Sequence, residues 1–285
     1  MTRALTVLDA GPLTTVQDRG RRGWAHLGVP RAGALDAPAA GLANRLVGNG
    51  PDAGLLETTL GGVVLRVSSA MSVAVTGAPG PVDVDGRAVP RAEPLALRAG
   101  AVLRVGPATE GVRAYVAVAG GVDVPPVLGS RATDTLAWVG PPRVADGDVL
   151  PVGRPSAGPA PVDVAAARPW RRPAVLRLHV GARADWFTGA AVGTLLSSSY
   201  DVTGESNRVG LRLRGPALER AREGELPSEG IVLGALQVPP DGQPLVFLHD
   251  HPTTGGYPVV GVVEPADLWQ CAQLRPGEQV RFTRP

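Results

Sequence analysis

The sequence of 285 residues contains no lysine, so every one of its 28 basic side chains is an arginine. A covalently attached biotin, a Schiff base and the phosphate-binding lysine of a P-loop all need a lysine amine. The chain therefore carries no covalent biotin and performs none of these reactions by itself. Cysteine and isoleucine occur once each, as Cys271 and Ile231, so an internal disulfide is excluded.

Long apolar runs and concentrated charge are also missing. No stretch approaches the roughly 18 uninterrupted apolar residues that a membrane-spanning helix needs. The formal net charge is only +2, and no arginine-rich run is interleaved with aromatic residues, the pattern typical of nucleic-acid binding. The first residues do not resemble a secretory leader. We therefore expect a cytoplasmic chain with no membrane and no nucleic acid among its partners.

Short apolar segments separated by turns make up most of the sequence. The 38 glycines and 29 prolines disfavour long helices. Runs rich in Val and Leu, such as GVVLRV at 62–67 and VLRLHV at 175–180, have the length of strands. Asp-Gly pairs at 85–86, 146–147 and 241–242 predict hairpin turns. The pattern predicts an all-β fold.

Helical signals are few and short. The stretch Asp36–Asn44 begins with a good N-cap residue, and Asp267–Leu274 is followed by Arg-Pro-Gly. A third, weaker signal lies at Pro216–Arg222. We expect these segments to be accessory helices packed on β-structure.

A segment rich in proline and alanine divides the chain. It has no sustained hydrophobic period and is typical of a semi-extended linker. The sequence therefore predicts an N-terminal lobe at residues 1–155, a linker at 156–172 and a C-terminal lobe at 173–285.

Five polar clusters interrupt the strand pattern. Their hydroxyls, amides, arginines and glycines suit the binding of a carboxylate, a phosphate or an oxyanion, although a well-bonded turn uses the same residues. The clusters are residues 14–21, 129–134, 205–210, 226–230 together with Gln237, and 250–258. No G-x-S-x-G elbow, P-loop or dinucleotide fingerprint is present, which disfavours a self-contained hydrolase or ATPase.

The histidines and the cysteine are interpreted as structural. His249 and His251 share one face of a strand, but a metal site needs at least a third ligand at a recognisable spacing. We therefore predict no metal site. His179 is expected to point outward from its strand, and Cys271 is expected to be a buried small apolar residue.

At the polar clusters the sequence resembles the biotin-dependent carboxyltransferase-like family, nearly from end to end. Five motifs in the family's order carry the resemblance: GPLTTVQDRGRRGWAHLGVPRAGALD at 11–36, LANRLVGN at 42–49, YVAVAGGVDVPPVLGSRATDT at 115–135, SNRVGLRLRGPAL at 206–218 and PSEGIVLGALQVPPDGQPLVFLHDHPTTGGYPVVGVV at 227–263. The family includes the C subunit of 5-oxoprolinase (PxpC), KipA and the carboxyltransferase portion of urea carboxylase, the type also named after the second subunit of allophanate hydrolase.

The resemblance implies two cyclophilin-like β-barrel lobes with a few short accessory helices. It implies an enzyme subunit, inactive without its partners, that works with the A subunit and a KipI-like B subunit of 5-oxoprolinase in the ATP-dependent opening of 5-oxo-L-proline, a small-molecule substrate, to L-glutamate. ATP with Mg²⁺ would act in the assembled complex. Two alternatives stay open: a biotin-dependent carboxyltransferase of the urea carboxylase type, and a non-enzymatic KipA-like module that binds a KipI-like antikinase.

The resemblance and the chemistry of the clusters together suggest site residues. Glu229 and Asp250, each in a polar turn at a strand edge, are the candidate catalytic acid and base. Arg131 and Arg208 are the candidate contacts to anions, namely the substrate carboxylate and a phosphate. The remaining substrate- or anion-binding candidates are Ser130, Thr133, Asn207, Gln237, Thr254, Gly255, Gly256 and Tyr257.

The chain departs from the family pattern at two places. Many relatives have A-D-R-Q-T-T-G-G-Y-P-K where residues 249–259 are HDHPTTGGYPV, so an arginine, a glutamine and a lysine are replaced. Ala132 stands where the family's G-S-R-S-T motif has its second serine. Roles that depend on the replaced side chains are not carried over.

Overall fold

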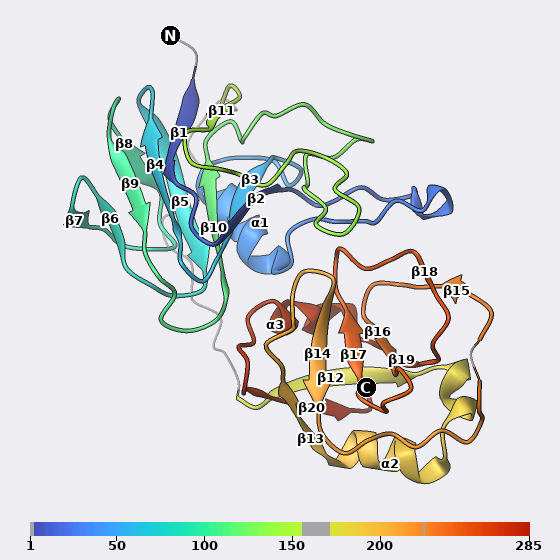
Figure 1. Ribbon diagram of the computed structural model, residues 1–285. Coiled ribbons are helices and arrows are strands. Elements are labelled where there is room, and N and C mark those ends of the chain that lie inside the picture. Colours follow the sequence, from blue (N-terminus) through green and yellow to red (C-terminus); the bar gives the residue numbers. More distant parts are fainter. Residues whose placement is uncertain (1–2, 156–171, 225) are drawn as a thin grey trace. The chain divides into compact units, whose positions relative to one another are not determined.

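The structure is a computed structural model, and it describes residues 3–155, 172–224 and 226–285 (Figure 1). The chain forms two compact units. The described residues of unit 1 are 3–21, 32–134 and 138–155, and those of unit 2 are 22–31, 135–137 and 172–285 except 225. Two short segments from the N-terminal half therefore belong to unit 2. The linker predicted at 156–172 lies outside the described residues except for Arg172, so the lobe boundaries stay a prediction.

Unit 1 consists of two antiparallel sheets. The first has the order β11 (Val149–Pro151), β1 (Ala4–Asp9), β4 (Val63–Val67), β9 (Val102–Val105), β6 (Val82–Val84) and β7 (Arg87–Ala88). The second has the order β2 (Leu13–Gln17), β3 (Leu55–Thr59), β10 (Arg113–Val118), β5 (Met71–Gly77) and β8 (Leu95–Leu97). Apolar side chains from both sheets form one core.

Strand β10 shows how the sequence positions the second sheet. Ala114, Val116 and Val118 belong to the core that both sheets share. The alternate residues Tyr115 and Ala117 belong to a second cluster, formed with helix α1 (Ala37–Leu46). Because side chains alternate between the faces of a strand, β10 is buried throughout. Asp36 begins α1 as its N-cap, with the Ala39 N–H donating to its carboxylate at 3.0 Å.

Unit 2 is built on a closed barrel of seven strands. Their order is β12 (Ala174–Val180), β19 (Val259–Val263), β16 (Ala235–Gln237), β17 (Leu245–Phe247), β14 (Gly210–Arg214), β13 (Ser199–Val202) and β20 (Gln279–Thr283). Strands β12 and β20 pair in parallel, and the other barrel neighbours are antiparallel. Tyr200 and Phe282 fill the interior with their rings edge to face, 6.1 Å apart. A separate pair, β15 (Glu229–Gly230) and β18 (Thr254–Gly255), forms a small two-stranded sheet.

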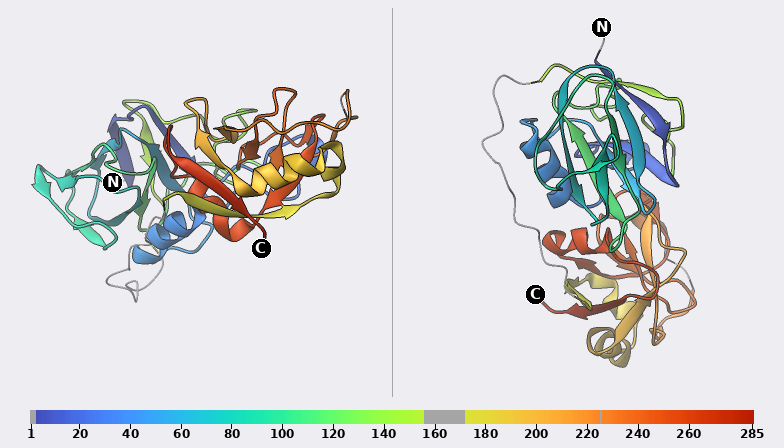
Figure 2. Two further views of the ribbon diagram at one scale, coloured as in Figure 1. Left: turned by 90° about the horizontal axis from the view of Figure 1, so that it is seen from below. Right: turned by 90° about the vertical axis from the view of Figure 1, so that its left-hand side faces the viewer.

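The helices of unit 2 are short. Helix α2 (Gly189–Ser197) contacts β20 and lies along the outside of the barrel, as Figure 2 shows. The others are α3 (Leu268–Cys271) and the 3₁₀ helices η1 (Ala25–Leu27), η2 (Ala182–Trp186) and η3 (Pro265–Asp267). Within the described residues, no helix has the length and apolar character needed to cross a membrane.

The predicted fold class is confirmed: strands dominate, unit 2 is a closed barrel and the helices are short accessories. His179 is exposed on β12 and Cys271 is buried, as predicted. Two helix predictions need correction. Residues 216–222 form no helix, because Leu218 N–H bonds to Gly242 and Ala221 N–H bonds to Trp186 instead of to the preceding turn. The helix predicted at Asp267–Leu274 is only the single turn of α3.

Candidate functional site

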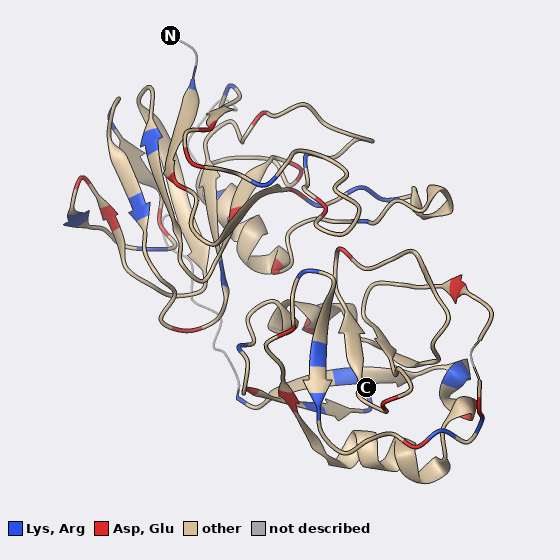
Figure 3. Ribbon diagram, viewed as in Figure 1, with Lys and Arg blue, Asp and Glu red and all other residues tan. Residues whose placement is uncertain are grey.

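The predicted site residues fall into groups on each of the two units. Charged residues are dispersed along both units, with arginines and acidic residues interspersed (Figure 3). The buried polar contacts around the predicted residues define the candidate site. We describe unit 1 first.

Asp18, at the end of β2, fixes the segment that contains Ser130 and Arg131. Its carboxylate is buried and accepts hydrogen bonds from Gly20 N–H at 2.7 Å, Ser130 Oγ at 2.6 Å and Arg131 N–H at 2.6 Å. Ser130 Oγ also accepts from Ala132 N–H at 3.0 Å. Ser130, predicted as a substrate contact, is thus occupied in holding the turn.

Arg131 presents a partly exposed cation beside this turn. Its Nη2 donates to Asp123 Oδ1 at 2.7 Å, and its side chain is 29% exposed. A planar guanidinium has five N–H groups, so this one contact leaves donors for another anion. Arg131 therefore keeps the geometry expected of an anion contact.

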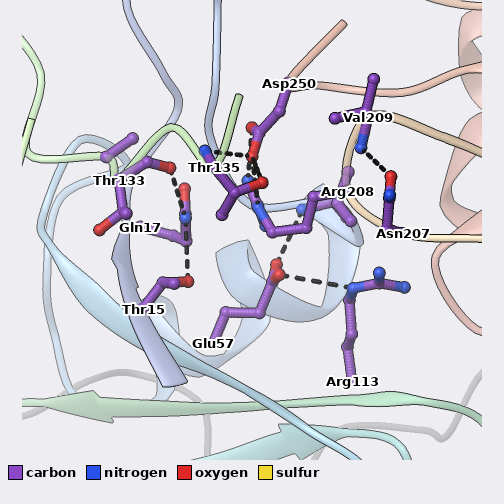
Figure 4. A network of polar contacts seen from close by, with 12 residues as sticks. Thr15, Gln17, Glu57, Arg113, Thr133, Thr135, Asn207, Arg208, Val209 and Asp250 are labelled. Carbon is purple, nitrogen blue, oxygen red and sulfur yellow. Dashed lines mark hydrogen bonds and ion pairs between the residues drawn. The ribbon is translucent and has the colours of Figure 1, made fainter. Parts of the chain in front are cut away.

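Gln17 and Thr133 lie together in the interior of unit 1, as Figure 4 shows. The Gln17 amide donates from Nε2 to the Thr133 carbonyl at 2.9 Å and to Thr15 Oγ1 at 3.0 Å. Thr133 N–H donates to the Val16 carbonyl at 2.9 Å. Thr133 was predicted as a site residue. Gln17 is not among the predicted site residues, although it lies in the first polar cluster, directly before Asp18.

Glu57 is a second functional group that the sequence reasoning did not select. It is 1% exposed, and it accepts from Leu35 N–H at 3.0 Å and from the Tyr115 hydroxyl at 2.9 Å. Arg113 Nε lies 3.5 Å from its other oxygen. Burial, followed by the neighbouring Glu57 charge, raises the pKa of Tyr115 well above its usual value. A carboxylate in the middle of the short segment LLETT, directly after two leucines, was the available signal.

In unit 2, Arg208 and Asp250 form a buried, two-pronged ion pair. Arg208 Nε donates to Asp250 Oδ2 at 2.9 Å, and Nη2 donates to Oδ1 at 3.0 Å. The side chains are 2% and 0% exposed. Asp250 Oδ2 also accepts from Thr135 N–H at 2.9 Å and Thr135 Oγ1 at 2.7 Å (Figure 4).

This geometry favours a positioning role for both residues over the roles assigned from the sequence. A general base needs an oxygen within reach of the substrate, and both Asp250 oxygens are occupied by Arg208 and Thr135. Arg208 uses Nε and Nη2 for Asp250, and its side chain is 2% exposed, so the face of the guanidinium that would grip an anion with two prongs is already engaged. Asn207 Oδ1 accepts from Val209 N–H at 2.8 Å and therefore shapes the same turn.

Glu229 forms an ion pair with Arg183 of η2. Arg183 Nε donates to Glu229 Oε2 at 3.0 Å, and Nη2 contacts the other oxygen. The hydrogen bonds from Arg183 are the largest cause that lowers the pKa of Glu229 below its usual 4.5. The carboxylate therefore stays ionised at neutral pH, which disfavours a role as general acid.

The small sheet of β15 and β18 brings several predicted residues together. Glu229 pairs with Gly255, and Gly230 pairs with Thr254, whose side chain is exposed. Gln237 Nε2 donates to the Tyr257 carbonyl at 3.1 Å, and a Cβ on Gly255 would lie 3.0 Å from the same nitrogen. At Gly256 the space is limited by backbone, since an added Cβ would lie 3.1 Å from the Leu226 carbonyl oxygen. The glycines therefore allow the chain at and after β18 to pack closely beside Gln237 and the Leu226 carbonyl.

His251 is buried next to this group. Its Nδ1 lies 2.7 Å from the Pro252 carbonyl, so that nitrogen carries the proton. Burial is the largest cause that lowers the pKa of His251 below 6.5, and nearby Arg31 lowers it further. The imidazole is therefore neutral at pH 7. In the described part of the chain, no three His, Cys, Asp or Glu side chains are grouped so that they could hold a metal ion.

Comparisons with known proteins agree with the motifs. A family model described as "Carboxyltransferase domain, subdomain A and B" matches residues 27–284. The chain is 37% identical to the C subunit of 5-oxoprolinase from Escherichia coli (strain K12), covering 98% of this chain and 91% of that relative. It is 33% identical to urea amidolyase of Lachancea kluyveri, covering 98% of this chain but 17% of that protein.

Solved structures with the same fold include larger proteins. TTHA0988 matches with a TM-score of 0.89 and 40% identity, covering 99% of this chain and 55% of that chain. Urea amidolyase of K. lactis matches with a TM-score of 0.88 and 30% identity, covering 99% of this chain and 18% of that one. The chain thus spans about half of TTHA0988 and less than a fifth of the amidolyase. The resemblance stated from the motifs is confirmed.

Proposed function

We propose, because the chain belongs to the carboxyltransferase family of subdomains A and B, that it is the C subunit of a multi-subunit 5-oxoprolinase. Together with the A and B subunits it would hydrolyse 5-oxo-L-proline to L-glutamate in the cytoplasm. ATP, bound as its Mg²⁺ complex, would be the co-substrate: one water hydrolyses the lactam, and a second accounts for the conversion of ATP to ADP and phosphate.

The observation that carries this proposal is the extent of the match to the E. coli protein. The alignment covers 98% of this chain and 91% of that relative, whereas it covers only 17% of the Lachancea kluyveri urea amidolyase. A match along nearly the whole of that relative supports assignment to the C subunit over assignment to a urea amidolyase. The word "subunit" in the relative's name also supports the presence of partner chains.

The contribution of this chain is placement of the substrate. A lactam is stabilised by resonance, so ring opening depends on activation of its carbonyl and on firm orientation of the ring. Arg131 supports the placement because its partly exposed, forked guanidinium suits a carboxylate. Gln237, Tyr257 and the neighbouring Gly255 and Gly256 provide polar groups next to the small sheet of β15 and β18 for a second set of contacts.

Arg208 and Asp250 serve this placement indirectly. Their ion pair binds both the N–H and the hydroxyl of Thr135, so it fixes the backbone of residues 135–137 in unit 2. Glu229 and Arg183 hold the β15 strand in the same way. We assign positioning roles to these four side chains.

Biotin-dependent carboxyl transfer is the second candidate function. It is favoured by the K. lactis urea carboxylase structure, which matches with a TM-score of 0.87 and 31% identity. Carboxybiotin supplies an activated carboxyl group for transfer. Because this chain has no lysine, the biotin would be carried by a partner chain.

Reconstitution with its partners tests the proposal. The chain is co-expressed with candidate A and B subunits, and glutamate release from 5-oxo-L-proline is measured with and without ATP. ATP-dependent release only in the full complex is the expected result. Transfer of labelled carboxyl from carboxybiotin to urea, without glutamate release, would replace the proposal with the second candidate.

A further inference from the structure

Several buried polar side-chain atoms of unit 1 have no hydrogen-bond partner among the described residues, and two of them belong to neighbouring residues. These two are Gln17 Oε1 and Thr133 Oγ1, and both side chains are 0% exposed. The residues are adjacent, because Gln17 Nε2 donates to the Thr133 carbonyl. Buried acceptors and hydroxyls are nearly always satisfied, so such a pair indicates a missing partner.

The orientation of the Gln17 amide is set by its neighbours. Its nitrogen faces the Thr133 carbonyl, which can only accept a hydrogen bond. Rotating the amide by half a turn would place two acceptor oxygens against each other. The oxygen of Gln17 is therefore the atom left without a partner, whichever way the hydroxyl of Thr15 points.

The neighbouring turn is largely satisfied within the chain. The Asp18 carboxylate, next along the chain, accepts three hydrogen bonds. Ser130 Oγ both donates to Asp18 and accepts from Ala132 N–H. Arg131 Nε, which belongs to a charged group, is also buried without a partner among the described residues, whereas Gln17 Oε1 and the Thr133 hydroxyl are a neutral acceptor and a neutral donor.

We propose that Gln17 and Thr133 bind the amide group of the substrate. Gln17 Oε1 would accept from its N–H, and the Thr133 hydroxyl would donate to its C=O. An amide of this kind is shared by a lactam and by urea. Because solvent reaches neither atom here, binding requires a local opening of the chain. The assignment to 5-oxo-L-proline in particular rests on the proposed function.

The test compares Thr133→Val with Thr133→Ser in the complex with the A and B subunits. Valine has the shape of threonine but lacks the hydroxyl, and that hydroxyl makes no contact that the fold needs. We expect Thr133→Val to raise the KM for 5-oxo-L-proline about tenfold and Thr133→Ser to restore it. The matched control is Thr14→Val, since Thr14 Oγ1 is buried and donates to the Ala10 carbonyl at 2.7 Å. That control should lower stability and leave KM unchanged.

A second arm addresses Gln17 with a substrate analogue. The lactone counterpart of 5-oxoproline has a ring oxygen in place of the N–H, and this oxygen would face the Gln17 oxygen. We expect the inhibition constant of the lactone for the wild-type complex to be at least tenfold higher than the KM for the lactam. Equal binding of lactam and lactone, together with an unchanged KM for Thr133→Val, would show that the two atoms hold only an internal water and would overturn the inference.

Urea binding separates the amide site from the reaction proposed for the complex. If the wild-type complex releases no glutamate, the proposed function fails, and calorimetric titration with urea then tests the pair. Weaker urea binding by Thr133→Val than by Thr133→Ser would support the amide site. Identical urea binding by both variants, or no urea binding by the wild type, would remove it.

Discussion

Replacing Arg208 separates a positioning role from direct contact with substrate. The wild-type side chain makes two charge-assisted hydrogen bonds to Asp250, at 2.9 and 3.0 Å, in a site where neither partner is more than 2% exposed. Lysine keeps the charge but offers a single amine, so at least one of the two contacts is lost. A hydrogen bond to a charged group contributes about 1.5–3 kcal/mol, and we expect Arg208→Lys to lower the free energy of unfolding by about 2 kcal/mol.

The uncharged variant Arg208→Met should be worse. It leaves Asp250 buried without its counter-ion, which typically costs about 3–5 kcal/mol. Arg45→Lys is the control, because Arg45 is exposed on α1 and its replacement should change stability by less than about 0.5 kcal/mol. Urea denaturation at pH 7 measures all three variants against the wild type.

The decisive comparison is between stability and kinetics. If Arg208 positions Thr135 through Asp250, Arg208→Lys loses stability and kcat falls with little change in KM. A variant with wild-type stability and a KM for 5-oxo-L-proline raised thirtyfold would refute this reasoning, since Arg208 would then bind the substrate directly.

Three further outcomes are expected. Arg183 lowers the pKa of Glu229, so the stabilisation from this pair is present above pH 4.5 and is lost as pH falls through the lowered pKa. When the pH is lowered from 6 to 3, the urea midpoint should therefore fall further for the wild type than for Glu229→Gln. Asp36→Ala should lower the free energy of unfolding by about 1 kcal/mol through loss of the α1 cap, with Asp36→Ser restoring it, as measured by thermal and urea unfolding. Gly100→Ala should lower the free energy of unfolding by about 1 kcal/mol, and Gly77→Ala should lower it more. Both glycines have φ of +80°, but only at Gly77 would the added Cβ lie 2.5 Å from a carbonyl oxygen. Equal losses in urea denaturation would contradict the packing argument.

Local patterns were sufficient to predict the strands and helix α1 but not helix α2. The run GAAVGTLLS at Gly189–Ser197 contains two glycines, and only Ala191 and Leu195 are buried. Its helical character depends on the Thr188 cap, which accepts from Ala191 N–H at 3.1 Å, and on packing against β20. Contacts with a distant strand decide this element, and the sequence of the segment alone does not contain them.

The site shows the same division between local and distant information. Residue types identified Ser130, Arg131 and Asp250 as unusual, because hydroxyls, arginines and carboxylates interrupt apolar strands. Their partners are far away in sequence: Asp18 lies 112 residues before Ser130, and Thr135 lies 115 residues before Asp250. Spacing therefore located the polar clusters, while the pairing that makes Asp250 a positioning residue followed only from the fold.

The buried carboxylates of this chain are engaged by donors of the chain itself. Asp18, Glu57 and Asp250 are all buried, and each accepts two or more hydrogen bonds from neighbouring residues. A carboxylate in such a setting holds loops in place, because its oxygens are occupied by neighbouring donors instead of facing a substrate. Glu229 is held by Arg183, and His251 is neutral with its Nδ1 proton directed at the Pro252 carbonyl. Within the proposed function, these occupied carboxylates leave the chain suited to recognition of a neutral amide and an anion.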